Sequence, residues 1–448
     1  MSGLTLALAE RAGAISYDAV PDDVREIARQ ALLDWFAVTL AGSREDGPAK
    51  LLEVLSAGDG GTEADAAAAA DVTVVGHGVR LPPLRAALVN GTASHQLDFD
   101  DVNIVYVAHV TVAVLGAALA LAEQLDRDAG ALIEAFVAGY ETTCRVAAAL
   151  GPEPYLRGFH STGTLGTFGA ATACARLLGL DAPTTARALG IAASEAAGLK
   201  CNFGTMTKPL HAGRACENGL LAALLAARGF SASPDAIEAA QGFAEISGAD
   251  LDADAALAPA PEGWHLRANL FKHHASCFFT HSAIEGVREL GVRADEIARV
   301  SIHVSELELG TCVVPAPRTG LEAKFSIAHL AAMAILDRDT RTIDDHAARD
   351  EQTSALRAKI VLVSDGRPGA PTRVDVELID GSVRSASHDV NRPERDLAVQ
   401  RGRLSDKFTA LAVPVLGSAR ADDLLSTLAQ LDRERPVREL TRLAVPER

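Results

Sequence analysis

A short segment near residue 100 carries an unusual density of carboxylates. The segment SHQLDFDDVN, residues 94–103, places Asp98, Asp100 and Asp101 within four positions, with His95 just upstream. Metal binding, proton donation of the terpene-cyclase kind and simple loop solvation with helix capping all use such a pattern. A terpene cyclase surrounds its substrate with aromatic rings, yet only 4% of this chain is aromatic. A metal site needs further ligands at a recognised spacing, and the flanking sequence offers none. The plainest interpretation is a solvated, helix-capping loop.

A second segment gathers basic groups. GTMTKPLHAGRACENG, residues 204–219, places Lys208, His211 and Arg214 within seven positions, directly before a strongly apolar helical stretch. A solvated basic loop would account for the pattern. In a chain of net charge −17, however, bases collected beside a buried helix also predict a binding site for an anion.

The segment GFHSTGTLGTFGAATACARLLGL, residues 158–180, combines a histidine with regularly spaced glycines. The glycine spacing fits neither GxGxxG nor GxxxxGK, and no strand pattern precedes it, which argues against a phosphate loop. We expect a helix with small residues every three positions, packed closely against other helices. Ser161 or Thr162 would cap this helix, and a ligand carboxylate would lie at its N-terminus beside His160. The glycines are Gly163, Gly166 and Gly169.

A fourth segment, FKHHASCFFTHSAIEG at residues 271–286, contains Lys272, His273, His274, Cys277 and His281. Cys277 and His281 are four residues apart, a spacing that suits a metal on one helix face or a Cys–His nucleophile pair. A buried thiol is the commoner situation, and no third orienting group is evident.

Composition and charge restrict the class of protein. The net charge of −17 argues against a nucleic-acid partner, because a basic face is expected there. None of the six cysteines forms a CxxC pair, so free thiols in a reducing, cytoplasmic compartment are expected. Glu10 and Arg11 interrupt the first apolar stretch, and no run of about 18 apolar residues occurs. We therefore expect neither a secretory signal nor a membrane partner.

Hydrophobic periodicity predicts a mainly α protein. Residues 22–41 have the spacing of an amphipathic helix, with Asp22 and Asp23 where the helix dipole favours negative charge. The stretch 58–71, GDGGTEADAAAAAD, is predicted to be a low-complexity surface loop. From about 112 to 265 the pattern is almost entirely helical.

The pattern changes near residue 270. Residues 299–310 and 359–364 alternate like strands, and 372–390 predicts a hairpin with Asp380 and Gly381 at its turn. A helical stretch, 326–337, lies between them, and helical periodicity returns after about 405. The expected domains are a helical segment at 1–268, an α/β domain at 269–404 and a helical return at 405–448.

Taken in order, five segments resemble the MmgE/PrpD family, which includes 2-methylcitrate dehydratase, cis-aconitate decarboxylase and iminodisuccinate epimerase. The stretches that carry the resemblance are LVNGTASHQLDFDDV, GFHSTGTLGTFGAA, GTMTKPLHAGRACENG, FKHHASC and LEAKFSIAHLAAMAILD. The resemblance extends over nearly the whole chain. It implies a large helical domain built from both chain ends, a smaller inserted α/β lid, a homodimer, and neither a metal nor another cofactor.

The resemblance also implies functional residues. The catalytic candidates are Asp98, His109, His160, Lys208 and Lys272. The basic segment adds His211 and Arg214 as substrate-binding candidates, and the segment 271–286 adds His274 and Cys277. Lys272 opens the α/β block, so the site is expected to form where the two domains meet. Asp100 is expected to face away from the pocket.

The loop around His109 departs from the family pattern at three positions. Val102 stands where threonine is common, Asn103 where histidine is expected, and Val110 where proline follows His109. These changes predict a more apolar edge to the pocket.

The family's reactions share one chemical problem, which is to stabilise negative charge on a carbon beside a carboxylate. Cations must hold the substrate carboxylates, and an acid or base must lie within hydrogen-bond reach. Lys208, Lys272 and His160 would supply the charge, and His109 and Asp98 would handle protons. We predict a cofactor-independent hydro-lyase for a small di- or tricarboxylate. The alternatives are an epimerase or isomerase, a decarboxylase on a similar acid, and a non-catalytic ligand-binding relative.

Overall fold

The computed structural model describes residues 3–57, 72–312, 314–364 and 371–447. The predicted surface loop 58–71 lies outside the described residues. The chain divides into two compact units. The first comprises Met1–Cys201, Thr207–Phe271 and Glu394–Arg448, and the second comprises Asn202–Met206 and Lys272–Pro393. Both chain ends therefore belong to the first unit.

Within its described residues, the first unit is helical apart from a two-stranded ladder of β1 (Val72–Thr73) and β2 (Arg80–Leu81). Its described α-helices are α1 (Leu4–Ala14), α2 (Asp22–Gly42), α3 (Asp46–Ala57), α5 (Pro83–His95), α6 (Val110–Gln124), α7 (Ala129–Leu150), α8 (Glu153–Arg157), α9 (Ser161–Leu177), α10 (Ala182–Glu195), α11 (Thr207–Ala227), α12 (Phe243–Ser247), α13 (Ala253–Leu257), α20 (Leu397–Leu416), α21 (Ser418–Ala429) and α22 (Val437–Leu443).

Small residues let the central helices α6, α7, α9 and α11 pack closely, as the glycine spacing of α9 predicted. A Cβ atom added at Gly169 in α9 would lie 2.8 Å from the carbonyl oxygen of Gly139 in α7. Any side chain at this position would therefore push the two helices apart. The close approach makes a rigid base on which the helix ends can hold polar side chains.

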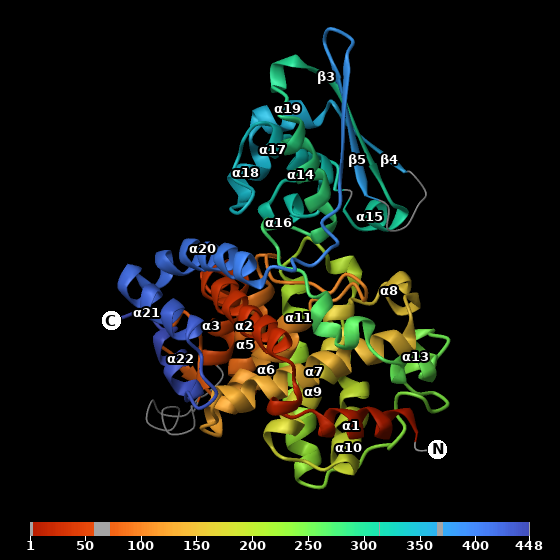
Figure 1. The fold of residues 1–448 in the computed structure, drawn as a ribbon, viewed down its shortest axis with the longest axis vertical. Coiled ribbons are helices and arrows are strands. Elements are labelled where there is room, and N and C mark those ends of the chain that lie inside the picture. The colour runs from red at the N-terminus through yellow and green to blue at the C-terminus, as the bar shows by residue number, and fades with distance from the viewer. Residues whose placement is uncertain (1–2, 58–71, 313, 365–370, 448) are drawn as a thin grey trace. The chain divides into compact units, whose positions relative to one another are not determined.

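The C-terminal return packs against the N-terminal part of the chain. The amphipathic helix predicted at 22–41 is α2, and its buried face includes Trp35 and Phe36. Helix α20 lies beside α2, although more than 350 residues separate them in sequence. Figure 1 shows this pair as a red and a blue helix in contact. The described part of α20 begins at Leu397, earlier than the expected return near 405.

The second unit combines a mixed four-stranded sheet with helices. The strand order is β4-β3-β5-β6; β3 pairs with β4 in parallel and with β5 antiparallel, and β5 and β6 form an antiparallel hairpin. Its described elements are α14 (His281–Leu290), β3 (Ile297–Val304), α15 (Glu306–Thr311), α16 (Gly320–Ala323), α17 (Ile327–Ile335), α18 (Asp345–Arg349), α19 (Glu351–Arg357), β4 (Ile360–Ser364), β5 (Thr372–Leu378) and β6 (Val383–His388).

The strand predicted at residues 299–310 is confirmed only in its first half. The stretch 299–310 was expected to be extended throughout, but β3 ends at Val304 and α15 follows it. Ser305 and Glu308 form a capping box, which satisfies backbone donors at the helix start and outweighs the alternating pattern. The predicted hairpin is confirmed, with Gly381 at a φ of 83° in its turn.

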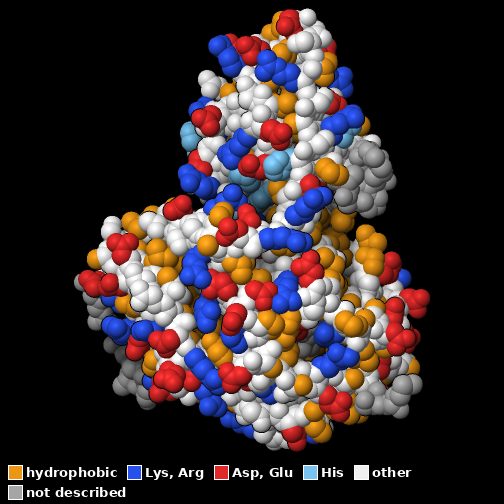
Figure 2. All heavy atoms as spheres, in the orientation of Figure 1, with side chains coloured by type: hydrophobic (Ala, Val, Ile, Leu, Met, Phe, Trp, Pro, Cys, Tyr) orange, Lys and Arg blue, Asp and Glu red, His pale blue; other side chains and the backbone are white. Residues whose placement is uncertain are grey.

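On the face drawn in Figure 2, Lys and Arg side chains are interspersed with Asp and Glu. None of the helices that the structure describes has both the length and the apolar character needed to cross a bilayer.

Candidate active site

Four helix ends of the first unit meet around the acidic segment 94–103, called the acidic loop below. Helix α5 ends at His95, His109 is the N-cap of α6, His160 is the N-cap of α9, and Lys208 lies in the first turn of α11. The backbone N–H of His109 donates to the Thr162 hydroxyl at 3.1 Å, which joins the starts of α6 and α9. Helix N-termini favour negative charge, so this junction suits carboxylates.

Ser161 and Thr162 do not cap α9, contrary to the prediction. The N-cap is His160, with no capping bond from its side chain. The Thr162 hydroxyl instead accepts from the start of α6. The helix therefore begins at Ser161, earlier than either predicted cap would place its start.

The first carboxylate of the loop, Asp98, pairs with Lys208. The Lys208 ammonium lies 2.6 Å from Asp98 Oδ2, and both side chains are almost completely buried. Asp98 has a φ of 52°, which is unusual for a residue other than glycine. The loop therefore turns sharply at Asp98, and this turn directs the carboxylate to the start of α11.

The second carboxylate, Asp100, lies between two histidines. Its Oδ2 is 2.9 Å from His95 Nδ1 and 2.9 Å from His109 Nδ1. His109 Nδ1 is also 2.8 Å from the backbone oxygen of Asp101. Asp100 was expected to face away from the site, and that expectation is wrong. The sharp turn at Asp98 brings Asp100 back toward α5 and α6.

These contacts define the protonation of the group. Burial acts to raise the pKa of Asp100, but the two histidines beside it lower the pKa well below its usual range. Burial, only partly offset by Asp100, lowers the pKa of His95 to about 4. At neutral pH Asp100 is thus a carboxylate and His95 is a neutral imidazole whose Nδ1–H donates to it.

His109 is held in one orientation with its second nitrogen turned toward Asp98. Both acceptors at Nδ1, a carbonyl and a carboxylate, require a proton on that atom. His109 Nε2 lies 3.8 Å from Asp98 Oδ1. The imidazole is 11% exposed, whereas the Asp98 and Asp100 side chains are 4% and 1% exposed. His109 Nε2 is therefore placed to exchange a proton next to the Asp98–Lys208 pair.

His160 and His211 form a second imidazole pair. Their Nδ1 atoms are 3.0 Å apart, and the rings of His160 and His95 are stacked at 5.7 Å. Gly198 makes room for this pair: its φ is 142°, and an added Cβ would lie 3.2 Å from His211 Cγ and 3.4 Å from His160 Cβ. The loop therefore requires glycine here both for its backbone and for the two rings.

The His160 pair carries no charge at neutral pH. Burial and then the Lys208 charge lower the pKa of His160 well below its usual value, and the same two causes lower the pKa of His211 to about 4. The positive charge expected at His160 is therefore absent. His160 offers a neutral imidazole for hydrogen bonding, and Lys208 provides the cationic group of this cluster.

The third carboxylate, Asp101, belongs to a buried hydrogen-bonded chain. Its Oδ2 accepts from the Thr111 hydroxyl at 2.6 Å and from Asn269 Nδ2 at 2.7 Å. Asn269 Oδ1 accepts from the Tyr140 hydroxyl at 3.0 Å, and Tyr140 accepts from Asn103 Nδ2 at 3.2 Å. Burial raises the pKa of Asp101 to about 8. Asp101 is therefore a neutral acid at neutral pH, unlike its neighbour Asp100.

The three departures from the family pattern lie in the interior. Val102, Asn103 and Val110 are buried with at most 2% exposure. The backbones of Val102 and Leu270 exchange two hydrogen bonds of 2.9 Å. Asn103 joins the Tyr140 chain described above. These three residues therefore pack in the interior beneath the loop. Because they are buried, they do not make the edge of a pocket more apolar.

A lysine of the C-terminal return also contacts the acidic loop. The Lys407 ammonium of α20 lies 2.6 Å from Asp34 Oδ1 of α2 and donates to the Phe99 carbonyl at 2.6 Å. It also lies 3.9 Å from the centre of the Phe99 ring. No sequence pattern indicates this contact, because a lysine in an amphipathic helix is ordinarily solvent-exposed.

Arg214 does not join the cluster. Lys208 and His211 are buried on one side of α11, but Arg214 is half exposed and pairs with Glu217 on the same helix. A helix turns by about 100° per residue, so each step of three residues shifts the side chain by about 60°, and Arg214 lies about 120° around the helix from Lys208, on the solvent-exposed side. The buried basic group on α11 therefore contains Lys208 and His211 but not Arg214.

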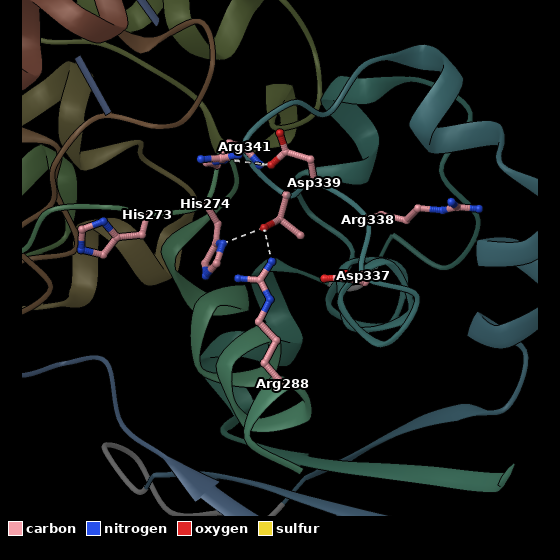
Figure 3. Close-up of a pocket in the computed structure, with 8 residues that line it drawn as sticks. His273, His274, Arg288, Asp337, Arg338, Asp339 and Arg341 are labelled. Carbon is pink, nitrogen blue, oxygen red and sulfur yellow. Dashed lines mark hydrogen bonds and ion pairs between the residues drawn. The ribbon is translucent and has the colours of Figure 1, made fainter. Parts of the chain in front are cut away.

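Three candidates lie in the second unit. Lys272 is fully buried, and Cys277 is buried with 9% exposure. His274 hydrogen-bonds to the Thr340 hydroxyl and to Glu285, both at 2.7 Å. Arg288 also donates to the Thr340 hydroxyl, at 3.1 Å. Figure 3 shows His274 and Arg288 close together, beside the Asp339–Arg341 pair, in a pocket of about 350 Å³. His274 is thus engaged in contacts within its own unit, and the roles of Lys272 and Cys277 remain predictions.

The same cluster could be arranged around a cation. Among the described residues, His95, Asp98, Asp100 and His109 form a group whose potential ligand atoms all lie within 4.8 Å of one another. However, Asp100 already accepts from both imidazoles, and the Lys208 ammonium is 2.6 Å from Asp98. Hydrogen bonds and one ion pair therefore account for this geometry, and a divalent ion would have to displace them.

Sequence reasoning missed part of the cluster. His95, Asp100 and Asp101 were treated as loop residues, although they lie in the same segment as Asp98. The available signal was the position of His95 at a helix end five residues before Asp100, which allows a turn to bring the two together. Lys407 and Asp34 could not be found in this way, because each is an isolated charge in a long helix.

The family comparison covers both parts of the chain. Residues 6–254 match the MmgE/PrpD N-terminal domain, and residues 274–433 match the MmgE/PrpD C-terminal domain. The chain belongs to the MmgE/PrpD family.

Characterised relatives align with most of this MmgE/PrpD protein. A cis-aconitate decarboxylase of Aspergillus terreus is 28% identical over 472 residues, covering 96% of this chain and 94% of that protein. The cis-aconitate decarboxylase of Homo sapiens is 29% identical over 376 residues, covering 79% and 78%. A cis-aconitate decarboxylase-like protein of Aspergillus oryzae is 25% identical over 464 residues, covering 95% and 93%.

Proposed function

We propose that this protein is a cofactor-independent lyase that decarboxylates cis-aconitate or a closely similar unsaturated tricarboxylate. The observation that carries the proposal is the buried Asp98–Lys208 pair with His109 beside it. The full-length similarity to cis-aconitate decarboxylases supports carbon–carbon cleavage over the hydro-lyase activity that the sequence favoured. The acidic loop and the helix N-termini around it lie within the matched N-terminal domain.

The proposed step balances without a redox partner. The bond from carbon to one carboxylate breaks, carbon dioxide leaves, and the electron pair stays on the carbon. The remaining carbon–carbon double bond and carboxylate delocalise that charge, and a proton then forms a new carbon–hydrogen bond. The product is a five-carbon unsaturated dicarboxylate. The protein must hold the remaining carboxylates, stabilise the developing charge and deliver one proton.

The cluster supplies a group for each task. Lys208, beside the N-terminal ends of α6, α9 and α11, would bind a substrate carboxylate. His160 would donate or accept a hydrogen bond as a neutral imidazole. Protonated His109 would deliver the proton from Nε2, with Asp100 stabilising the imidazolium and Asp98 next to the transfer path. A substrate carboxylate would then replace Asp98 as one partner of Lys208.

Lys272 remains part of the proposal as a second contact to a substrate carboxylate, as the family resemblance implies. A homodimer is proposed on the same ground. Light scattering at the elution peak would then give about twice the chain mass of 46.7 kDa, and the chain mass itself would contradict the dimer.

The decisive experiment compares three chemistries in one assay. Purified protein is incubated separately with cis-aconitate, with a 2-hydroxy tricarboxylate, and with a chiral amino- or imino-dicarboxylate in deuterated water, and products are followed by NMR. Carbon dioxide release from cis-aconitate supports the proposal. Loss of water from the hydroxy acid, or exchange at Cα without net product, would replace it by the hydro-lyase or the epimerase. Binding without turnover of any acid would favour a non-catalytic relative.

A further inference from the structure

Lys407 is buried at the back of the acidic loop. Its side chain is 5% exposed and the paired Asp34 is 2% exposed. The ammonium contacts Asp34 Oδ1 and the Phe99 carbonyl oxygen, each at 2.6 Å. A lysine is rarely buried unless paired, and here the pairing extends to the backbone of a loop from another part of the chain.

Phe99 is the residue between the two functional carboxylates. Asp98 on one side pairs with Lys208, and Asp100 on the other accepts from His95 and His109. The φ of 52° at Asp98 is costly for a residue other than glycine. Such a turn persists only where surrounding contacts hold it. The Phe99 carbonyl, fixed by a charged donor, and the buried Phe99 ring are two such contacts.

We propose that Lys407 is a positioning residue of the active site. Its ammonium anchors the Phe99 carbonyl and thereby holds Asp98 toward Lys208 and Asp100 toward His109. The inference rests on the proposed function for its catalytic consequence. It assigns a role to the C-terminal return: α20 carries Lys407 into the interior, where its ammonium fixes the loop at the Phe99 carbonyl.

The simpler alternative is that Lys407 and Asp34 only join α20 to α2. The chain offers a matched comparison for this case, because Arg401 of α20 also pairs with α2, at 2.6 Å from Glu26. Glu26 lies eight residues before Asp34 on that helix. If joining the helices were the whole role, removing either pair would affect stability in proportion to its burial and leave turnover unchanged.

The test uses four variants measured well below their melting temperatures. Lys407→Met alone is expected to destabilise the protein strongly, because it leaves Asp34 charged and buried. Lys407→Met with Asp34→Asn removes both charges and is expected to recover most of that stability. Asp34→Asn alone keeps the bond from Lys407 to Phe99, and Arg401→Met is the helix-joining control.

If Lys407 positions the loop, turnover should fall in the double variant even though most of its stability is recovered. The double variant should lose roughly tenfold to a hundredfold in kcat with a smaller change in KM, since a displacement of about 1 Å in an active site costs up to that factor. Asp34→Asn and Arg401→Met should keep turnover within about threefold of wild type. A double variant with wild-type turnover would overturn the proposal, as would an equal loss in Arg401→Met. If the double variant does not fold, Lys407→Leu in the Asp34→Asn background, which also carries no donor, takes its place under the same two criteria.

A second measurement separates this inference from the proposed reaction. Histidine-selective ¹⁵N NMR follows the Nδ1–H donors of His95 and His109, which depend on Asp100 and need no substrate. The double variant should shift or lose these signals even if no acid is turned over. Unchanged imidazole signals would show that Lys407 does not position the loop, whatever the reaction is.

Discussion

Replacing Asp100 by asparagine tests the arrangement of the two imidazoles most sharply. Asp100 is ionised at neutral pH and lies 2.9 Å from the Nδ1 atoms of both His95 and His109. An asparagine has nearly the same shape but carries no charge. It keeps one acceptor oxygen and presents an N–H group where the second acceptor was.

The size of the effect follows from these contacts. A hydrogen bond to a charged group is worth about 1.5–3 kcal/mol. Asp100→Asn removes the charge that would stabilise His109 as an imidazolium and leaves an acceptor for only one ring. A loss of about 2–3 kcal/mol in the transition state corresponds to roughly a 30- to 150-fold decrease in kcat. KM should change less, because the altered contacts do not hold a substrate carboxylate.

The neighbouring residue supplies the matched control. Asp101 is neutral at neutral pH, since burial raises its pKa to about 8. Asp101→Asn therefore replaces one neutral, hydrogen-bonded group by another, and turnover should stay within about threefold. Both variants are compared by kcat and KM for carbon dioxide release at pH 7, with melting temperatures measured in parallel. Equal losses in the two variants would refute the protonation states assigned to this loop, and wild-type turnover in Asp100→Asn would refute the role of Asp100.

The remaining predictions use the same residues. Lys208→Met should destabilise the protein by about 3–5 kcal/mol, because Asp98 is left charged and buried; adding Asp98→Asn should restore stability in urea unfolding but not activity. The pKa of Asp101 is raised, so its stabilising contribution is complete below about pH 4 and is lost as the pH rises through about 8. Melting temperature should therefore fall less between pH 6 and 9 in Asp101→Asn than in wild type. Activity should survive exhaustive EDTA treatment, and restoration by one divalent ion after such treatment would instead support a metal at His95 and its neighbours.

The expectation for Lys208 also changes once its partner is known. A lysine that serves only to bind a substrate anion would be unpaired in the empty protein, and its removal would hardly affect folding. The Asp98 carboxylate at 2.6 Å reverses that expectation. A contact between residues 110 positions apart depends on how α5 and α11 pack, which periodicity does not reveal.

The helices were predictable where one face is continuously apolar. Residues 22–41 follow this rule and form α2 nearly to the residue. The hairpin at 372–390 followed from alternation and a turn dipeptide. The helix α15 was missed, because the short capping box at Ser305 outweighs a six-residue alternating pattern. Local hydrogen bonds decide such short segments, and they are weak signals in sequence.

The site was predictable where several polar residues share one segment. Asp98, His109, His160 and Lys208 were found through family motifs, and the structure brings them together at four helix ends of one unit. Their charges were not predictable. Whether His160 is charged or Asp101 is neutral depends on burial and on partners from distant helices. The same holds for Lys407, whose function depends on where α20 packs.

The most direct test of the central claim is turnover of cis-aconitate labelled with ¹³C in all carboxylates. The account predicts one equivalent of labelled carbon dioxide and one equivalent of a five-carbon unsaturated dicarboxylate from wild type. It also predicts at least a hundredfold slower release from the Lys208→Met/Asp98→Asn double variant, which should remain folded. Unchanged cis-aconitate with wild-type protein, or equal release from the double variant, would contradict it.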